Sequence, residues 1–259
     1  MPDIYSKFTF KASNRPSAKE ARQALINKYG DYDASEADVI IALGGDGFML
    51  ETLTSNMALV KRGLPIYGMN RGTIGFLMND YHLDNLPQRL SAAEIAHIHP
   101  LKMIAEGPGG PFTSLAFNEV SLFRQTGQAA HIKISVDGKE RLERLIADGV
   151  LIATPAGSTA YNLSAHGPVL PLTSDILALT PISAFRPRRW RGAIIGSHAK
   201  VVFDVLEADK RPVSATADNK EHRNITRVEV SQDWSTQFTL LFDADHGLDE
   251  KILREQFST

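Results

Sequence analysis

The chain has 259 residues, 43% of them hydrophobic and 22% charged, which suits a globular protein with one large core or two smaller ones. A net charge of −2 gives no overall field that favours nucleic acid or an anionic membrane, and no apolar run approaches membrane-spanning length. The absence of cysteine excludes disulfides, thiolate catalysis and cysteine-ligated zinc; with an N-terminus unlike a signal peptide, it predicts a soluble cytoplasmic protein.

The first hundred residues alternate between strand and helix patterns. We expect a strand over 5–10, a helix opened by a Ser-Ala-Lys-Glu capping box at 17–20, a buried strand over 39–43, a helix ending near Gly63, a short strand over 64–68 and a helix over 84–93. This alternation predicts an α/β domain over 1–99, with a small parallel, Rossmann-like sheet and helices packed on it.

The turn after the buried strand has the composition of a binding site. Gly44, Gly45, Asp46 and Gly47 follow the strand directly, and three glycines in four positions let the backbone approach a ligand closely. The N–H groups at the start of the following helix favour binding of a phosphate. The carboxylate of Asp46 would repel that phosphate. Asp46 therefore has a second task there, such as holding a metal or taking a proton from a hydroxyl, unless it only caps the helix.

A second glycine-punctuated turn, over 70–77, follows the next predicted strand. Ligands of open α/β sheets bind beyond the carboxyl ends of the strands, where both turns would lie.

After residue 99 the pattern changes to that of half-buried strands. Ile132, Ile134 and Val136 alternate with polar residues, and Asp137-Gly138 is typical of a hairpin turn. We expect a mainly antiparallel β domain over 100–240, and a tail over 241–259 that returns to the first domain as a helix.

A second candidate site follows the strand that ends at Thr154. A Pro-Ala-Gly turn leads to residues suited to cap a short helix, and neutral hydrogen-bonding side chains there suit a base amide or a ribose. These side chains are Ser158, Thr159, Tyr161, Asn162 and Ser164. The alternative is an ordinary capped helix with a half-buried tyrosine.

Asn118 and Glu119 form an unusual polar pair inside the predicted apolar strand 115–123. A carboxylate that accepts ribose hydroxyls and an amide that contacts an adenine edge would use both, and a solvated strand edge is the alternative. The basic segment 186–191 is either a solvated face or a phosphate contact.

Several other site patterns are absent. The chain has no Walker motif, no G-x-S-x-G and no H-E-x-x-H, and Leu50 stands where the dinucleotide fingerprint of hydride-transfer enzymes needs glycine. The eight histidines have no metal-ligand spacing.

Taken together, these motifs resemble the NAD kinase family of the bacterial type. The order matches: Gly-Gly-Asp-Gly at 44–47, then Asn118-Glu119, then Gly-Ser-Thr-Ala-Tyr-Asn-Leu-Ser at 157–164. Phe48 and the pair Ala165-His166 depart from the family pattern, which has a small polar residue and a glycine pair there.

The resemblance implies a kinase that moves the γ-phosphoryl group of ATP to the adenosine ribose 2′-hydroxyl of NAD, giving NADP and ADP, with Mg²⁺ or another divalent metal. It also implies an N-terminal α/β domain, a β-rich C-terminal domain that binds NAD, and a homodimer or homotetramer with a shared active site. A kinase of the same superfamily acting on a lipid or sugar hydroxyl, or a non-catalytic NAD-binding regulator, are the alternatives.

The resemblance also implies roles for particular residues. Asp46 orients or deprotonates the 2′-hydroxyl, and the neighbouring glycines hold phosphate. Asn118 and Ser158 contact adenine, and Glu119 contacts the ribose. The remaining implied residues are Asp148 and Ala160 near the nicotinamide, Thr159, Tyr161, Asn162, Leu163 and Ser164 in the rest of the pocket, and Asp218 and Asn219 from a later segment.

Overall fold

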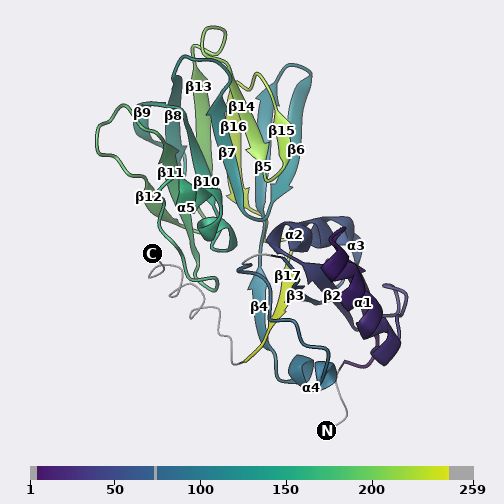
Figure 1. The fold of residues 1–259 in the computed structure, drawn as a ribbon. Helices are drawn as coiled ribbons and strands as arrows, with labels where there is room; N and C mark the ends of the chain where they lie inside the picture. The colour runs from purple at the N-terminus through teal and green to yellow at the C-terminus, as the bar shows by residue number, and fades with distance from the viewer. Residues whose placement is uncertain (1–4, 73–74, 245–259) are drawn as a thin grey trace. The chain divides into compact units, whose positions relative to one another are not determined.

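The structure, a computed structural model, describes residues 5–72 and 75–244 (Figure 1). The chain divides into two compact units. His99–Ser235 forms the second unit, and the described residues before and after that stretch form the first. Each unit has a sheet architecture of its own.

The first unit is built on a five-stranded sheet in the order β1-β2-β3-β17-β4. Its strands are β1 (Phe8–Ala12), β2 (Val39–Gly44), β3 (Ile66–Asn70), β17 (Phe238–Phe242) and β4 (Glu94–Ile98). The first four run parallel to their neighbours and β4 pairs antiparallel with β17. The expected parallel sheet therefore forms, but with an inserted strand, β17, that the sequence analysis had placed mostly in the β domain.

The helices of this unit differ in detail from expectation. They are α1 (Pro16–Tyr29), α2 (Asp46–Ser55), α3 (Met57–Val60) and α4 (Leu86–Ser91). The predicted capping box is wrong, because α1 has Arg15 at its N-cap without a side-chain cap bond, and the Ser17 hydroxyl donates to the Arg71 carbonyl. The single helix expected up to Gly63 is divided at Asn56.

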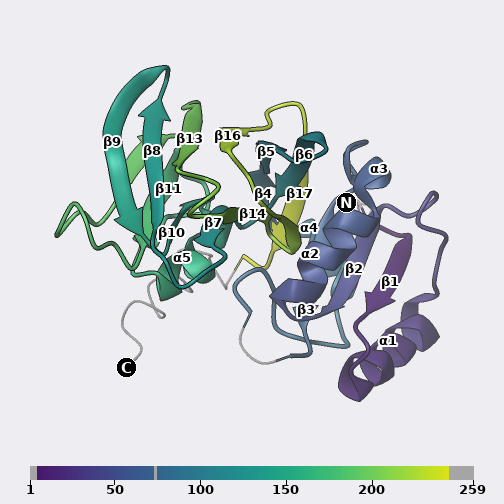
Figure 2. The same cartoon turned by 90° about the horizontal axis from the view of Figure 1, so that it is seen from above.

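Strand β2 is buried along its whole length because helices cover both faces of the sheet (Figure 2). Val39, Ile41 and Leu43 belong to one apolar cluster with α1 and α4. The intervening residues face the other side, since side chains alternate along a strand. This explains why a continuous apolar run, rather than an alternating one, encodes the strand.

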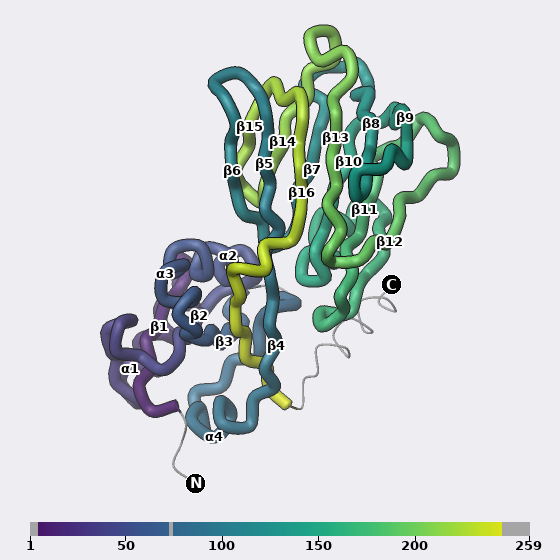
Figure 3. The backbone as a smooth tube through the Cα atoms, turned by 180° about the vertical axis from the view of Figure 1, so that it is seen from behind, coloured from purple at the N-terminus to yellow at the C-terminus, as the bar shows by residue number. Residues whose placement is uncertain are grey.

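The second unit consists of two six-stranded antiparallel sheets with one apolar core between them (Figure 3). One sheet contains, in spatial order, β12 (Ala193–Gly196), β11 (Ile176–Ile182), β10 (Gly149–Ala153), β7 (Glu119–Arg124), β14 (Val213–Ala217) and β15 (Lys220–His222). The other contains β6 (Gly110–Ala116), β5 (Leu101–Gly107), β16 (Arg227–Gln232), β13 (Val201–Leu206), β8 (Ala130–Val136) and β9 (Lys139–Ala147). The predicted hairpin is confirmed, since β8 and β9 pair around Asp137 and Gly138, which both have positive φ.

The segment after β10 covers the outer face of its sheet. It forms the 3₁₀ helix η1 (Ala156–Thr159) and the short helix α5 (Tyr161–Ser164). Alternate residues of β10 serve the two faces: Val150 and Ile152 join the core between the sheets, while Leu151 and Ala153 pack under this segment with Leu170.

The predicted tail helix over 245–257 lies outside the described residues. In the part of the chain that the structure describes, every helix is too short or too polar to span a bilayer.

Gly149 is the most sterically constrained position of β10, and Gly149→Ala tests the packing of that sheet. An added Cβ would stand 2.0 Å from the Leu122 carbonyl oxygen on the neighbouring strand, so a backbone has to move. We expect the free energy of unfolding to fall by about 1–3 kcal/mol in urea titrations. Gly127→Ala is the matched control, since none of the described atoms lies within 4 Å of its Cβ position. Equal stabilities of the two variants would contradict this packing.

Candidate active site

Asp46 is the first residue of α2, and its carboxylate reaches a segment thirty residues away. Oδ2 accepts a hydrogen bond from the Phe76 N–H at 2.8 Å, and Oδ1 accepts one from the Leu77 N–H at 3.0 Å. The N-cap position belongs to Gly45 and has no side-chain cap bond, so the interpretation of Asp46 as a simple helix cap is wrong. The carboxylate instead joins the two glycine turns at the carboxyl edge of the sheet.

The glycines of the first turn serve different purposes. A Cβ on Gly44 would stand 2.7 Å from the Phe48 Cβ, so this glycine makes room for the side chain that departs from the family pattern. At Gly45 and Gly47 an added Cβ would meet no described atom within 4 Å. These two positions, at the start of α2, are where a ligand has access to the backbone.

Gly75 makes the approach of the second turn possible. An added Cβ would stand 2.9 Å from the Asp46 Oδ1, which is closer than real Cβ atoms come. Sequence analysis missed Asn79, whose buried amide donates to the carbonyls of Gly68 and Leu241 and accepts from the Asp243 N–H. Asn79 thus anchors the second turn to both β3 and β17, and only its place beside a glycine turn hinted at this.

In the second unit, several predicted site residues meet at the N-terminal end of β7. This strand is antiparallel to both of its neighbours, and Glu119 pairs with Ala153, the last residue of β10. Val120 pairs with Ala217, the last residue of β14. The segments that follow β10 and β14 therefore leave the sheet beside Asn118 and Glu119. Contrary to expectation, residues 115–123 do not form one strand: Asn118 lies between β6 and β7, and Glu119 is the first residue of β7.

Glu119 is the most strongly perturbed acid of this cluster. Its Oε2 is buried and has no hydrogen-bond partner among the described residues. Burial, reinforced by the nearby Asp218 carboxylate, raises the pKa of Glu119 to about 7, although the Tyr161 N–H bonds to the carboxylate and opposes the shift. A buried acid with an unsatisfied oxygen is suited to accept a hydroxyl from a ligand.

Asp218 organises the backbone around that acid. It has φ +50°, and its carboxylate accepts hydrogen bonds from the N–H groups of Phe117 (2.7 Å), Asn118 (2.9 Å) and Glu119 (3.3 Å). Burial raises its pKa, and the three N–H groups act against that rise. Asp218 therefore holds the backbone of residues 117–119 in place, while its neighbour Asn219 is exposed.

The start of the 155–164 segment is tied to the same strand end. The Thr154 hydroxyl donates to the Phe117 carbonyl at 2.6 Å and accepts the Gly157 N–H at 3.0 Å. Gly157 needs to be glycine, because a Cβ would stand 2.1 Å from the Asn118 carbonyl oxygen. Thr154 is a residue that sequence analysis treated only as the end of a strand.

Two residues that were predicted to contact a ligand, Ser158 and Asn162, instead form hydrogen bonds within the protein through their side chains. The Ser158 hydroxyl, which was expected to cap a helix, donates to the Pro155 carbonyl at 2.7 Å and accepts the Leu170 N–H at 3.0 Å. Neither η1 nor α5 has a side-chain cap bond, so the predicted capping by Ser158 and Thr159 is wrong. A short hydroxyl in this setting stabilises its own loop.

Asn162 is similarly buried, with 0% of its surface exposed. Its amide donates to the carbonyls of Ser158 and Pro168, and its Oδ1 accepts the Thr180 hydroxyl at 2.7 Å. Thr180, on β11, is a second structural partner that the sequence did not reveal.

The other predicted residues surround this cluster. Asp148 precedes β10 and forms an ion pair with Arg124 at 2.5 Å. Tyr161 is 37% exposed, and partial burial together with the charges of Glu119 and Asp148 raises the pKa of its phenol. Thr159, Ala160 and Leu163 are partly buried and Ser164 is exposed.

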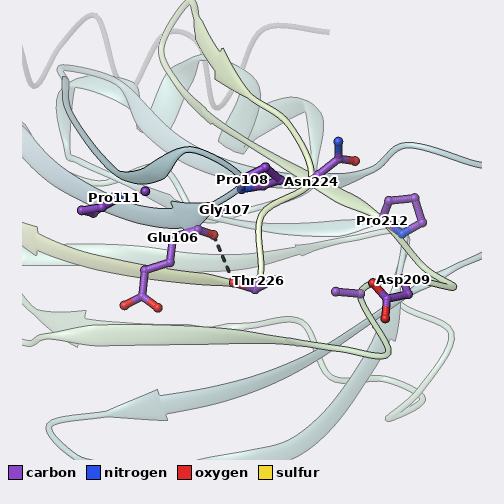
Figure 4. Close-up of a pocket in the computed structure, with 10 residues that line it drawn as sticks. Glu106, Gly107, Pro108, Pro111, Asp209, Pro212, Asn224 and Thr226 are labelled. Carbon is purple, nitrogen blue, oxygen red and sulfur yellow. Dashed lines mark hydrogen bonds between the residues drawn. The ribbon is translucent and has the colours of Figure 1, made fainter.

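A cavity of about 860 Å³ elsewhere in the second unit contains none of these residues. Figure 4 shows Pro108, Pro111 and Pro212 lining it, together with Glu106 and Asp209. The Thr226 hydroxyl donates to the Glu106 carbonyl at its wall. Two carboxylates and no cation make this cavity a poor site for a nucleotide phosphate.

Comparison with known proteins identifies the family. The family model of the ATP-NAD kinase N-terminal domain matches residues 4–94, and that of the ATP-NAD kinase C-terminal domain matches residues 117–234. The chain belongs to the ATP-NAD kinase family. Relatives described as NAD kinase include a Caulobacter vibrioides protein, 57% identical over 98% of this chain and 96% of its own length, and a Brucella suis protein, 52% identical over 99% of both.

Solved structures show the same fold. The crystal structure of yeast NADH kinase complexed with NADH has a TM-score of 0.81 at 19% identity, covering 98% of this chain and 89% of the other. An NAD kinase from Archaeoglobus fulgidus in complex with ATP has a TM-score of 0.72 at 23% identity, covering 95% and 96%. The predicted fold class and the predicted enzyme, a kinase that phosphorylates NAD with ATP, are confirmed.

The raised pKa of Glu119 gives this NAD kinase a testable pH dependence. The folded state holds the Glu119 proton more tightly than the unfolded state, so this residue lowers stability as pH rises from about 4.5 to 7. We expect Glu119→Gln to gain stability over the parent between pH 5 and pH 8, by about 3 kcal/mol at most. Urea unfolding at both pH values measures the gain. Glu221→Gln, at an exposed position of β15, is the control; a pH-independent difference for Glu119→Gln would contradict the assignment.

Proposed function

We propose that this NAD kinase uses Asp46 to orient and deprotonate the adenosine ribose 2′-hydroxyl of NAD, which then attacks the γ-phosphorus of ATP. The observation that carries the proposal is the attachment of Asp46 to Phe76 and Leu77 beside the open backbone of Gly45 and Gly47. The N–H groups of Phe76 and Leu77 fix the orientation of the Asp46 carboxylate, so that it does not depend on hydrogen bonds within α2. Phosphoryl transfer depends chiefly on such positioning and on charge neutralisation.

We further propose that the second unit binds NAD through Glu119, Asn118 and Tyr161. The buried, unsatisfied Glu119 Oε2 supports a contact with the ribose hydroxyls. The half-exposed ring of Tyr161 suits packing against a flat base or nicotinamide. Ser158 and Asn162 belong to the scaffold of this pocket, since their side-chain hydrogen bonds are used internally.

Mg²⁺, or another divalent cation, completes the proposal. Mg²⁺ commonly keeps several waters and is bound by substrate phosphates with one or two carboxylates. Within residues 5–72 and 75–244, no group of three His, Cys, Asp or Glu side chains could form a cage of its own. These residues fit a cation that ATP carries, with Asp46, the acid within the glycine turn, as the protein carboxylate that would hold it. When bound, the cation would neutralise phosphate charge.

Assembly and location rest on the family resemblance and on composition. We propose a homodimer or homotetramer with a shared site, acting in the cytoplasm without nucleic acid or membrane partners. A chain without cysteine suits a reducing compartment. Sedimentation equilibrium would measure the subunit number directly.

The experiment that tests the activity is direct. The protein is incubated with NAD, ATP and Mg²⁺, and the NADP formed is measured with an NADP-specific dehydrogenase. Exchanging NAD for NADH, and ATP for polyphosphate, defines the acceptor and donor range. Absence of NADP formation with retained NAD binding would support a non-catalytic regulator instead.

Asp46→Asn tests the role of the acid. We expect kcat to fall by about 10²–10⁴-fold, because the base is lost, while calorimetry shows NAD affinity close to that of the parent. The NH2 group of the new asparagine would face a backbone N–H of the second turn, which is also a donor, and this could lower stability. Urea unfolding of the variant should therefore be measured beside its kinetics. Glu51→Gln, at an exposed position of the same helix, is the control. A parental kcat in Asp46→Asn would exclude Asp46 as the base.

Tyr161→Ala tests the binding face of the second unit. Loss of the ring should raise KM for NAD more than it lowers kcat, and leave KM for ATP near the parental value. Tyr161→Phe keeps the ring and should stay close to the parent. If kcat fell with KM unchanged, the tyrosine would act in the chemical step rather than in binding.

A further inference from the structure

A cation that the sequence analysis did not single out lies at the carboxyl edge of the first unit's sheet. Arg15 follows β1 and stands at the N-cap of α1. Because β1, β2 and β3 are parallel, the segments that follow them meet at one edge. Arg15, Gly45 and Gly72 are the residues that each of these three segments brings there.

The close approach of these three residues is measured at Gly72. A Cβ added there would stand 3.4 Å from the Arg15 Nη1 and 3.5 Å from the Gly45 Cα. The Arg15 guanidinium and the Gly45 Cα therefore both lie within contact range of Gly72. This places the guanidinium near the backbone that opens the first glycine turn.

The two arginines at this edge differ in their engagement. Arg71 donates from Nε to the Ser17 carbonyl at 3.1 Å, and its guanidinium lies 4.5 Å from the Tyr81 ring centre. Arg15 is exposed, and its guanidinium has neither an ion pair nor a hydrogen bond with the residues that the structure describes. Arg71 thus fixes the turn, and Arg15 is available to a ligand.

Further donors surround this position. The Ser13 hydroxyl, at the end of β1, is buried without a partner among the described side chains and backbone groups. Helix α1 begins at Pro16, which has no N–H, and the N–H groups of Ala18 and Lys19 donate to the Arg15 carbonyl, so this helix contributes the positive end of its dipole rather than free donors. The acid of the turn, Asp46, is bonded to backbone amides. The Arg15 guanidinium and the Ser13 hydroxyl are therefore the donors near this edge that have no partner among the described residues, and both suit an anion.

We propose that Arg15 binds the triphosphate of ATP. A guanidinium matches two phosphate oxygens with paired N–H donors and stays charged at all working pH values. It would offset the repulsion between the triphosphate and Asp46, which the glycine turn alone cannot do. This inference rests on the proposed function only in taking the 44–47 turn as the ATP phosphate site.

The test compares Arg15→Gln with Arg62→Gln in equilibrium binding of ATP, ADP and adenosine to the full chain. Arg62 is an exposed arginine that precedes β3 and so belongs to the opposite, amino end of that strand. We expect Arg15→Gln to weaken ATP binding about ten-fold or more, to weaken ADP binding less or equally, and to leave adenosine binding unchanged. Arg15→Lys should fall between Arg15→Gln and the parent, because it keeps charge without the fork.

Kinetics and salt dependence separate a phosphate contact from a structural effect. KM for ATP should rise in Arg15→Gln while KM for NAD and the urea unfolding midpoint stay parental, and its ATP affinity should fall less steeply with salt than the parent's. The inference is overturned if ATP affinity stays within two-fold of the parent, or if adenosine binding falls as much as ATP binding. If the parent protein binds ATP but makes no NADP, the proposed function fails while these binding data still decide the role of Arg15.

Discussion

Both candidate regions depend on a carboxylate that accepts backbone N–H groups from a distant segment. Asp46 holds Phe76 and Leu77, and Asp218 holds the residues from Phe117 to Glu119. Loop backbone outside the strand ladders has to find hydrogen-bond partners, and a fixed carboxylate is a strong, charged acceptor for its N–H groups. Glycine completes the arrangement, since Gly75 and Gly157 admit backbones at distances that any side chain would prevent.

The two regions use charge in opposite ways. The first turn combines one engaged acid with the arginines 15 and 71 and with helix N-termini, a balance suited to a polyanion. The second cluster has two acids, Glu119 and Asp218, and its cation, Arg124, is paired with Asp148. Uncompensated carboxylates repel phosphate and attract hydroxyl donors, which matches a ribose. This difference in charge supports the proposal of a phosphate subsite at the first turn and a sugar subsite at the second cluster.

The sequence predicted those parts of the fold that local patterns encode. The buried run of β2, the Asp137-Gly138 hairpin and the change from α/β to antiparallel β follow from periodicity and turn chemistry. The position of β17 did not follow, because pairing with β3 joins segments some 170 residues apart and no local signal specifies a partner. The capping box failed because Ser17 finds a tertiary acceptor, the Arg71 carbonyl, which a linear motif cannot reveal.

The site residues show the same division between what local sequence patterns indicate and what only tertiary contacts determine. Residue types at short spacing indicated which side chains belong to the site, but not whether a polar group faces a ligand or its own loop. Ser158 and Asn162 look like ligand contacts in the sequence, but their side chains are hydrogen-bonded within the folded segment, with Leu170 and Thr180 as partners 12 and 18 residues further along the chain. A solvated edge was the alternative for Glu119, and the burial of its unpartnered Oε2 is seen only in the folded chain. A hydrogen-bond inventory of the folded chain thus helps to separate recognition from scaffolding, since a hydroxyl or amide that uses all its donors inside its own loop has no donor left for a substrate.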